Sequence, residues 1–232
     1  MTDERFAIYF AFDTDHPIWA KASSWLGRDV ATGQAVERPS GLAIDADRLA
    51  DLTAKAASYG FHGTLVAPFE LNVDHDAESL SDALQAFAQK QEPFDVPLEA
   101  AFLGNFAALR PRQAAAELMA LHTDLVKTFA PFRAPLLASD LERRSKGGVL
   151  TEQQQVYLKE WGYPYIFEDF RFHMTLSKSI SSEEERVAVL SALNTHFGGH
   201  LVEPVRADRL ALYHQPSRTE PFVIREWFHF SS

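Results

Sequence analysis

The chain has 232 residues, 46% of them hydrophobic and 23% charged, which is the composition of a globular protein long enough to build a real core. It contains no cysteine, and this excludes disulfides, thiol nucleophiles and cysteine-ligated zinc. The formal charge of −10 argues against a protein that coats long nucleic acid, because such binding needs clustered Lys and Arg. A small anionic ligand in a local basic pocket remains compatible with this charge.

The first residues give no sign of a targeting or membrane segment. Residues 1–5 are too acidic for the basic start of a signal peptide, and the early apolar run over residues 6–12 is far shorter than a membrane span. We therefore expect a cytoplasmic protein with no membrane partner, and a monomer as the default state.

Hydrophobic periodicity predicts the elements in chain order. The first half contains a strand over residues 5–13, helices over 16–26 and 45–58, a strand from 61, a helix over 77–89 and a hairpin over 94–109. Helices follow over 113–129 and 151–161, with the densest basic run, residues 131–148, between them. The second half contains a strand from 172, a helix over 182–197 and strands over 205–213 and 222–230.

One five-residue pattern occurs twice, as Phe61-His62-Gly63-Thr64-Leu65 and as Phe172-His173-Met174-Thr175-Leu176. Because side chains alternate along a strand, each copy has an apolar back and a front made of His and Thr. An imidazole carries a proton near neutral pH, and a hydroxyl donates to an oxyanion. A single strand His is usually structural, but packing alone does not require the same His and Thr in both copies. The duplication favours a phosphoryl site approached from two sides.

The order strand, helix, strand, strand occurs twice, and each time the first strand is the one that carries the motif. We therefore expect one α+β domain over residues 1–232, with a first repeat at about 59–111 and a second at about 169–230. Residues 112–168 form an inserted helical and basic arm between them. The expected fold has two β-sheet lobes related by a pseudo-twofold axis, with helices outside and a central cleft.

The two His-x-Thr motifs resemble those of the two-histidine (2H) phosphoesterase superfamily, which includes RNA ligase-like proteins and 2′,3′-cyclic nucleotide phosphodiesterases. Together with residues 59–65 and 170–176, the run Trp161-Gly162-Tyr163-Pro164-Tyr165 resembles a branch encoded with phosphonate-utilisation genes. This likeness extends from Arg5 to Phe230. It implies the bilobal 2H phosphoesterase-like fold and a phosphoesterase that uses no cofactor.

The expected catalytic residues are His62, Thr64, His173 and Thr175. One imidazole takes a proton from water, the other gives a proton to the departing ribose oxygen, and the two threonines hold the non-bridging oxygens. No metal is needed. The two histidines supply only two ligands where a catalytic zinc site usually has three protein ligands, so a metal hydrolase ranks third among the alternatives.

Alternation also selects groove neighbours, namely Tyr9, Arg171 and Tyr213, and leaves Lys178 on the other face. For each of them, an ordinary strand position is an equal alternative. Tyr165 is a further aromatic side chain available to stack on a base or a sugar. A second phosphate on the substrate would need a second cationic contact, for which Arg171, Arg143 and Arg144 are candidates.

Two classes of function remain open. In the first, the chain hydrolyses or transfers a phosphoryl group on a small cyclic ester, either a ribose phosphate of phosphonate metabolism or a 2′,3′-cyclic nucleotide. In the second, it binds an anionic ligand or an RNA end without catalysis. The presence of both His and both Thr favours the enzyme, because a binder needs cations more than a matched acid and base. A pH profile measured with and without a chelator separates the two classes.

Overall fold

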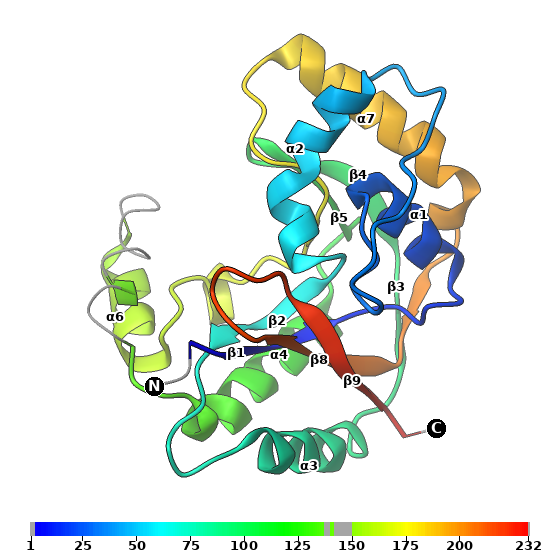
Figure 1. Ribbon diagram of the computed structural model, residues 1–232. Helices are drawn as coiled ribbons and strands as arrows, with labels where there is room; N and C mark the ends of the chain where they lie inside the picture. The colour runs from blue at the N-terminus through cyan, green and yellow to red at the C-terminus, as the bar shows by residue number, and fades with distance from the viewer. Residues whose placement is uncertain (1–2, 137–139, 142–149, 232) are drawn as a thin grey trace.

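The structure, a computed structural model, describes residues 3–136, 140–141 and 150–231. It is an α+β protein with two lobes, as the sequence predicts (Figure 1). A four-stranded antiparallel sheet has the order β2 (Gly63–Phe69), β1 (Arg5–Phe10), β8 (Arg209–Gln215), β9 (Val223–His229). A three-stranded antiparallel sheet has the order β4 (Leu98–Leu103), β5 (Phe106–Pro111), β6 (Met174–Thr175).

The helices are divided between the two sheets. In Figure 1, α3 and α4 lie below the four-stranded sheet, whereas α1, α2 and α7 surround the three-stranded sheet. The α-helices are α1 (Pro17–Leu26), α2 (Ala46–Tyr59), α3 (Ala77–Ala88), α4 (Ala116–Phe129), α6 (Glu152–Trp161) and α7 (Glu183–Phe197). Short 3-10 helices are η1 (Ala130–Phe132), η2 (Phe167–Asp169) and η3 (Gly198–Leu201). Among the helices of the described residues, none combines the length and the apolar character needed to cross a bilayer.

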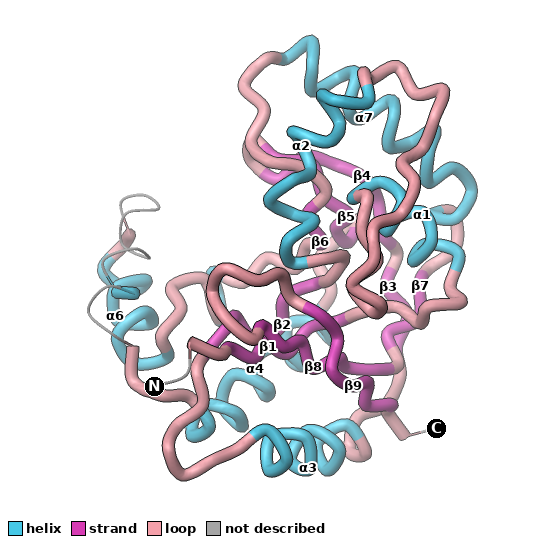
Figure 2. The backbone as a smooth tube through the Cα atoms, in the orientation of Figure 1, coloured by secondary structure: helices cyan, strands magenta, loops and turns pink. Residues whose placement is uncertain are grey.

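A small two-stranded sheet connects the lobes. Strand β3 (Phe94–Val96) pairs with β7 (Val205–Ala207), and both are magenta in Figure 2 beside the three-stranded sheet. The sequence predicts continuous strands over residues 94–102 and 205–213, but Pro97 and Asp208 interrupt them. Proline has no N–H to donate to a ladder, which explains the break before β4.

The two larger sheets share one strand order. For the strand pairing, we count β1 to β4 as the first half of the chain and β5 to β9 as the second half. Each motif strand, β2 or β6, then lies beside the strand that opens its half, β1 or β5. The next neighbour comes from the other half, β8 beside β1 and β4 beside β5. The strand orders of the two sheets match when the repeating units are taken to begin at β1 and at β5. The repeats expected at 59–111 and 169–230 begin instead at the motif strands. Each half of the chain therefore completes the sheet of the other half.

The core lies on both sides of the four-stranded sheet. Every residue of β1 is buried, with Phe6, Ile8 and Phe10 facing one way and Ala7 and Tyr9 the other. This strand is central in its sheet, so both of its edges are hydrogen-bonded, to β2 and to β8. Helix α4 packs against β2, where the imidazole Nδ1 of its His122 bonds the Leu65 carbonyl at 2.7 Å.

Candidate functional site

Both motifs contribute to one cleft. Phe61, Leu65 and Met174 are buried behind the two motif strands, and His62, Thr64 and Thr175 line a cavity of about 730 Å³. A volume of this size accommodates a whole small ligand rather than a phosphate group alone. His173 is half-buried next to this cavity, and its ring lies 5.3 Å from that of Phe106, a lining residue. The duplicated pattern therefore gathers at one place.

The two imidazoles are held in the same way. Nδ1 of His62 lies 2.8 Å from the carbonyl oxygen of Gly60, and Nδ1 of His173 lies 2.7 Å from that of Arg171. In each case the acceptor is the backbone two residues before the histidine. A carbonyl oxygen only accepts, so Nδ1 carries the proton, and Nε2 of the neutral ring is left as the basic nitrogen. Both histidines therefore have the tautomer that lets Nε2 take a proton from a bound molecule.

The surroundings disfavour a positive charge on either imidazole. The pKa of His62 is lowered to about 4, mainly by burial; the Gly60 carbonyl opposes this shift, and the nearby His173 adds to it. Burial likewise lowers the pKa of His173, and the Arg171 carbonyl opposes it. Both rings are therefore neutral near pH 7 in the unliganded protein. The pair is therefore set to accept protons and sensitive to an anion placed beside it.

Aromatic rings fix the position of His62. The ring of Tyr9 stacks on the imidazole with 4.0 Å between centroids and an interplanar angle of 21°. Tyr9 lies opposite Thr64 in the ladder of β1 and β2, and it is 1% exposed. Tyr59, at the end of α2, stacks on the same imidazole at 6.0 Å. The packed rings limit the rotamers of His62 and point its Nε2 in one direction.

The cleft is positively charged although the protein is acidic. Its lining includes Arg5, Lys55 and Lys178. The lining residues, all of which lie in the described part of the chain, include no Asp or Glu. In a chain with a formal charge of −10, this local excess of cations attracts an anionic ligand.

Comparison with known proteins identifies the family. The family described as "Protein of unknown function (DUF1045)" matches residues 64–223, which include β2, β6 and most of the two sheets. The chain belongs to the DUF1045 family.

Two curated proteins resemble this DUF1045 chain over almost its whole length. Both are named ribose 1,5-bisphosphate phosphokinase PhnN. The one from Janthinobacterium sp. (strain Marseille) is 35% identical over 228 residues, which are 96% of this chain and 49% of that protein. The one from Laribacter hongkongensis (strain HLHK9) is 34% identical over 225 residues, 94% and 50% respectively. The chain spans about half the length of the curated relatives it matches.

Solved structures give weaker likenesses. E. coli LigT complexed with NADP+ is 15% identical, with 100% of both chains covered and a TM-score of 0.43. E. coli LigT complexed with 3′-AMP is 14% identical, with 99% of both chains covered and a TM-score of 0.42. A protein described as a phosphoesterase is 12% identical, with 99% of both chains covered and a TM-score of 0.43.

The predicted aromatic neighbours in DUF1045 have three different positions. Tyr9 lines the cavity. Tyr213 lies beneath it, fully buried, and its hydroxyl donates to the Phe61 carbonyl at 2.8 Å, so it supports the motif strand from behind. Tyr165 is 41% exposed, with its ring edge-on to Tyr163 at 5.7 Å, and it is Tyr163 that lines the cavity.

Among the predicted basic neighbours, Arg171 does not lie in the cleft lining. Arg171 lines a separate cavity of about 600 Å³ together with Arg110 and Arg112, and its Nη1 donates to the carbonyls of Glu168 and Phe170 at 2.7 Å. Alternation fails for Arg171 because β6 contains only residues 174 and 175. Arg143 and Arg144 lie outside the described residues.

Sequence reasoning left out Lys178, which lines the cleft. The amides of Leu176 and Ser177 both donate to the Ala107 carbonyl, at 2.8 and 3.2 Å. Two residues therefore face one, as in a β-bulge, and the side-chain alternation shifts by one position after Leu176. The Lys178 ammonium reaches Asp51 of α2 at 2.6 Å. A bulge leaves no mark in the alternation of the sequence, so the sequence gives no signal for Lys178.

Sequence reasoning also left out Arg5 and Lys55. For Arg5 a signal existed, since it shares the face of Tyr9 on an alternating strand. Lys55 precedes Tyr59 by four residues on α2, so the two share a helix face. Which face of α2 meets the cleft depends on packing, and the sequence does not give it.

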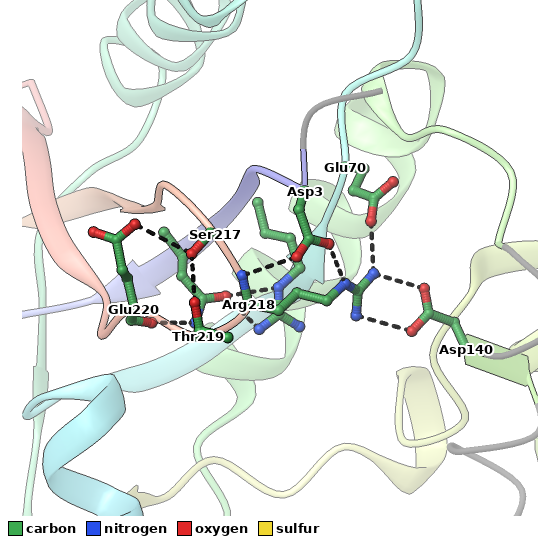
Figure 3. Close-up of polar contacts among 9 residues, drawn as sticks. Asp3, Glu70, Asp140, Ser217, Arg218, Thr219 and Glu220 are labelled. Carbon is green, nitrogen blue, oxygen red and sulfur yellow. Dashed lines mark hydrogen bonds and ion pairs between the residues drawn. The ribbon is translucent and has the colours of Figure 1, made fainter.

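The far end of the four-stranded sheet is held by an ion-pair cluster around Arg218, in the turn between β8 and β9 (Figure 3). Its guanidinium contacts Asp3 at 2.9 Å, Glu70 at 2.6 Å and Asp140 at 2.8 Å. These carboxylates come from the segments just before β1, just after β2 and after η1. Several charges in one partly buried network hold geometry better than an isolated surface pair. The cluster therefore fixes the end of the sheet on which Arg5 stands.

Proposed function

We propose that the chain is a metal-independent phosphodiesterase or phosphoryl-transfer enzyme that acts on a small cyclic phosphate ester. One observation carries the proposal. His62 and His173 have the same Nδ1 contact to a backbone carbonyl and the same Thr two residues later, and three of these four side chains line one cleft. Two matched imidazoles supply the acid and the base that a phosphodiester requires. The cationic lining suits its negative charge.

Hydrolysis assigns one role to each imidazole. Nε2 of one neutral ring takes a proton from water as the water oxygen bonds to phosphorus. The bond from phosphorus to one ring oxygen breaks, and Nε2–H of the other, protonated ring gives that oxygen its proton. The product is a phosphomonoester with a free hydroxyl, and one further proton exchange with solvent restores the enzyme. Thr64 and Thr175 donate to the non-bridging oxygens, where charge builds up in the transition state.

We also propose which histidine is the base. His62, with its pKa at about 4, is the more readily neutral ring and acts as the base, which leaves His173 as the acid. An anionic phosphate between the rings favours the protonated form of each, so bound substrate promotes the protonation that the acid needs. The order of events is ligand binding, protonation of His173 and then attack.

The substrate that we propose is a ribose cyclic phosphate of phosphonate metabolism. The curated relatives, of which this chain matches about half, are named as kinases of ribose 1,5-bisphosphate. Opening a ribose 1,2-cyclic phosphate that carries a 5-phosphate, with O2 as the leaving oxygen, yields ribose 1,5-bisphosphate. A phosphodiesterase half would thereby supply the substrate of a kinase half in the same protein.

A second candidate is a 2′,3′-cyclic nucleotide phosphodiesterase. Tyr59 and Tyr163 line the cleft and are only partly buried, so they are available to stack on a base. A third candidate, a noncatalytic binder of an anion or an RNA end, needs the cations of the lining but not two matched imidazoles. Turnover separates the third candidate from the first two.

Phosphorus NMR on a panel of esters tests the proposal. The panel contains a 2′,3′-cyclic mononucleotide and ribose 1,2-cyclic phosphate with and without a 5-phosphate, each incubated with the protein in excess chelator. We expect the cyclic phosphate signal to be replaced by a phosphomonoester signal. Binding of these esters without any turnover would support the noncatalytic candidate and contradict the enzyme.

A further inference from the structure

The cleft lining continues from His62 to Tyr59, whose ring packs on the buried ring of Phe222. Tyr59 stacks on Phe222 at 5.2 Å and on His62 at 6.0 Å, so one ring connects the two places. Two cavity-lining cations are placed near these rings, because the Arg5 guanidinium lies 5.5 Å from the centre of the Phe222 ring and Lys55 precedes Tyr59 by one helical turn. Neither has a part in the proton transfers described above.

Arg5 is a fixed cation at the floor of the cleft. Its side chain comes from β1, on the same face as Tyr9, and the residue is 7% exposed. Its Nε donates to Oε1 of Gln215 at 2.8 Å, and its guanidinium lies 5.5 Å from the centre of the Phe222 ring. A guanidinium held at two sides keeps one orientation, and it is the side chain that best matches the geometry of a phosphate.

Lys55 is a movable cation at the rim. It stands one helical turn before Tyr59 on α2 and is exposed. Within the described residues, its ammonium has neither a hydrogen-bond partner nor an ion-pair partner. Lys178, which also lines the cleft, differs because its ammonium is bonded to Asp51 of α2. Lys55 therefore brings a full positive charge to the cleft without a carboxylate that offsets it.

We propose that Lys55 and Arg5 form a second anion subsite, beside Tyr59 and Phe222, that binds a second phosphate of the substrate. The subsite rests on the proposed function and narrows it to bisphosphorylated small molecules, with a cyclic phosphodiester at the histidines and a phosphomonoester at the cations. Two separate cationic contacts in a lining without Asp or Glu are more than a single phosphate needs. Tyr59, which is only partly buried, provides apolar surface for the sugar between the two charges.

Two esters that differ only in the second phosphate test the subsite. KM and kcat are measured for ribose 1,2-cyclic phosphate with and without a 5-phosphate, in the wild type, Lys55→Met and Arg5→Met. Lys159→Met is the matched control, because Lys159 is an exposed lysine on α6 that does not line the cleft. Thermal unfolding shows whether each variant folds.

We expect the wild type to have a KM at least about tenfold lower for the 5-phosphate ester. Lys55→Met raises that KM by about tenfold, leaves kcat within about twofold and raises the KM of the other ester by much less. The effect shrinks at high salt, since the contact is between charges. If Arg5→Met does not fold, the KM values of Lys55→Met alone test the subsite.

Two outcomes overturn the subsite in distinguishable ways. If both esters are hydrolysed with equal KM, or if Lys55→Met changes both KM values alike, the subsite is wrong and the phosphodiesterase stands. If the wild type hydrolyses neither ester nor a 2′,3′-cyclic mononucleotide, the proposed function fails and the subsite fails with it.

Discussion

The ring of Phe172 lies where a β-carbon on Gly63 would have to be. Such a carbon would come within 2.4 Å of Cζ and 2.5 Å of Cε2 of Phe172, closer than non-bonded carbons approach. Gly63 separates His62 from Thr64, and Phe172 immediately precedes His173. The two motifs therefore pack directly against each other, and the one difference between them, Gly63 against Met174, makes this approach possible.

The substitution Gly63→Ala tests this contact. We expect a loss of about 1–3 kcal/mol of unfolding free energy, because the added carbon must push the Phe172 ring out of a packed core. Gly199→Ala is the matched control, since nothing lies within 4 Å of a β-carbon there. Urea unfolding at pH 7 measures both. Equal stability of the two variants would show that Phe172 does not need the space at Gly63.

The main elements could be predicted because their sequences carry a clear period. The alternation in residues 5–10 is strong, and the first strand forms there. The two His-x-Thr motifs lie side by side through the Gly63 and Phe172 contact, as their duplication suggests. Their catalytic roles remain a prediction that the experiments below address.

The other residues of the site could not be predicted, because their positions depend on features that leave no periodic pattern in the sequence. The bulge at Leu176 brings Lys178 into the lining, and residues 171–173 are not in a strand, which takes Arg171 away from it. Tyr213 has the predicted parity but lies one layer deeper, because Tyr9 covers that face. The exchange of strands between the two halves also could not be predicted, since pairing across long separations is set by packing rather than by local pattern.

The buried imidazole of His122 predicts a loss of stability in acid. Its Nδ1 bonds the Leu65 carbonyl at 2.7 Å, and its Nε2 accepts from the Phe167 amide at 3.2 Å, so only the neutral ring satisfies both contacts. Burial lowers its pKa to about 4, against the opposing effect of the Leu65 carbonyl. Between the ordinary pKa of 6.5 and 4, the unfolded chain binds a proton that the folded protein does not. Stability is therefore full above pH 6.5 and falls as the pH decreases.

The size of this effect is about 3 kcal/mol for His122 when the pH reaches 4. In His122→Gln, an amide that does not titrate replaces the imidazole, and we expect a smaller drop in unfolding free energy between pH 7 and pH 4.5. Urea unfolding at the two pH values gives both drops. An equal drop in the variant and the wild type would mean that His122 does not contribute to the acid sensitivity.

The rate of hydrolysis should have an optimum on the acid side of pH 6.5. In a plot of kcat/KM against pH, the two limbs report the pKa values of the acid and the base in the free enzyme. Activity falls at low pH as His62, with its pKa at about 4, becomes protonated and stops acting as a base. It falls on the other side as His173 loses its proton, at a pKa lowered from 6.5 by burial. The profile is measured with a cyclic ester in excess chelator. A single limb, or an optimum well above pH 7, would contradict these assignments.

The two threonines should matter less than the two histidines. Thr64→Val and Thr175→Val keep the shape of the side chain and remove the hydroxyl donor, and we expect kcat to fall by about 10- to 100-fold in each. Thr195→Val, on the exposed face of α7, is the control. Steady-state rates on the best ester of the panel provide the comparison. Unchanged kcat in both motif variants would contradict a role for the two hydroxyls in stabilising the transition state.

Replacement of the two histidines, singly and together, tests the central claim most directly. We expect kcat to fall by about 10²–10⁴-fold in His62→Ala and in His173→Ala, with the unfolding transition preserved. The double variant should lose little more than either single one, because the two rings act on one phosphoryl group as a unit. His200→Ala, an exposed histidine on η3, is the control. A double variant that folds and hydrolyses the cyclic ester at the wild-type rate would contradict a two-histidine mechanism.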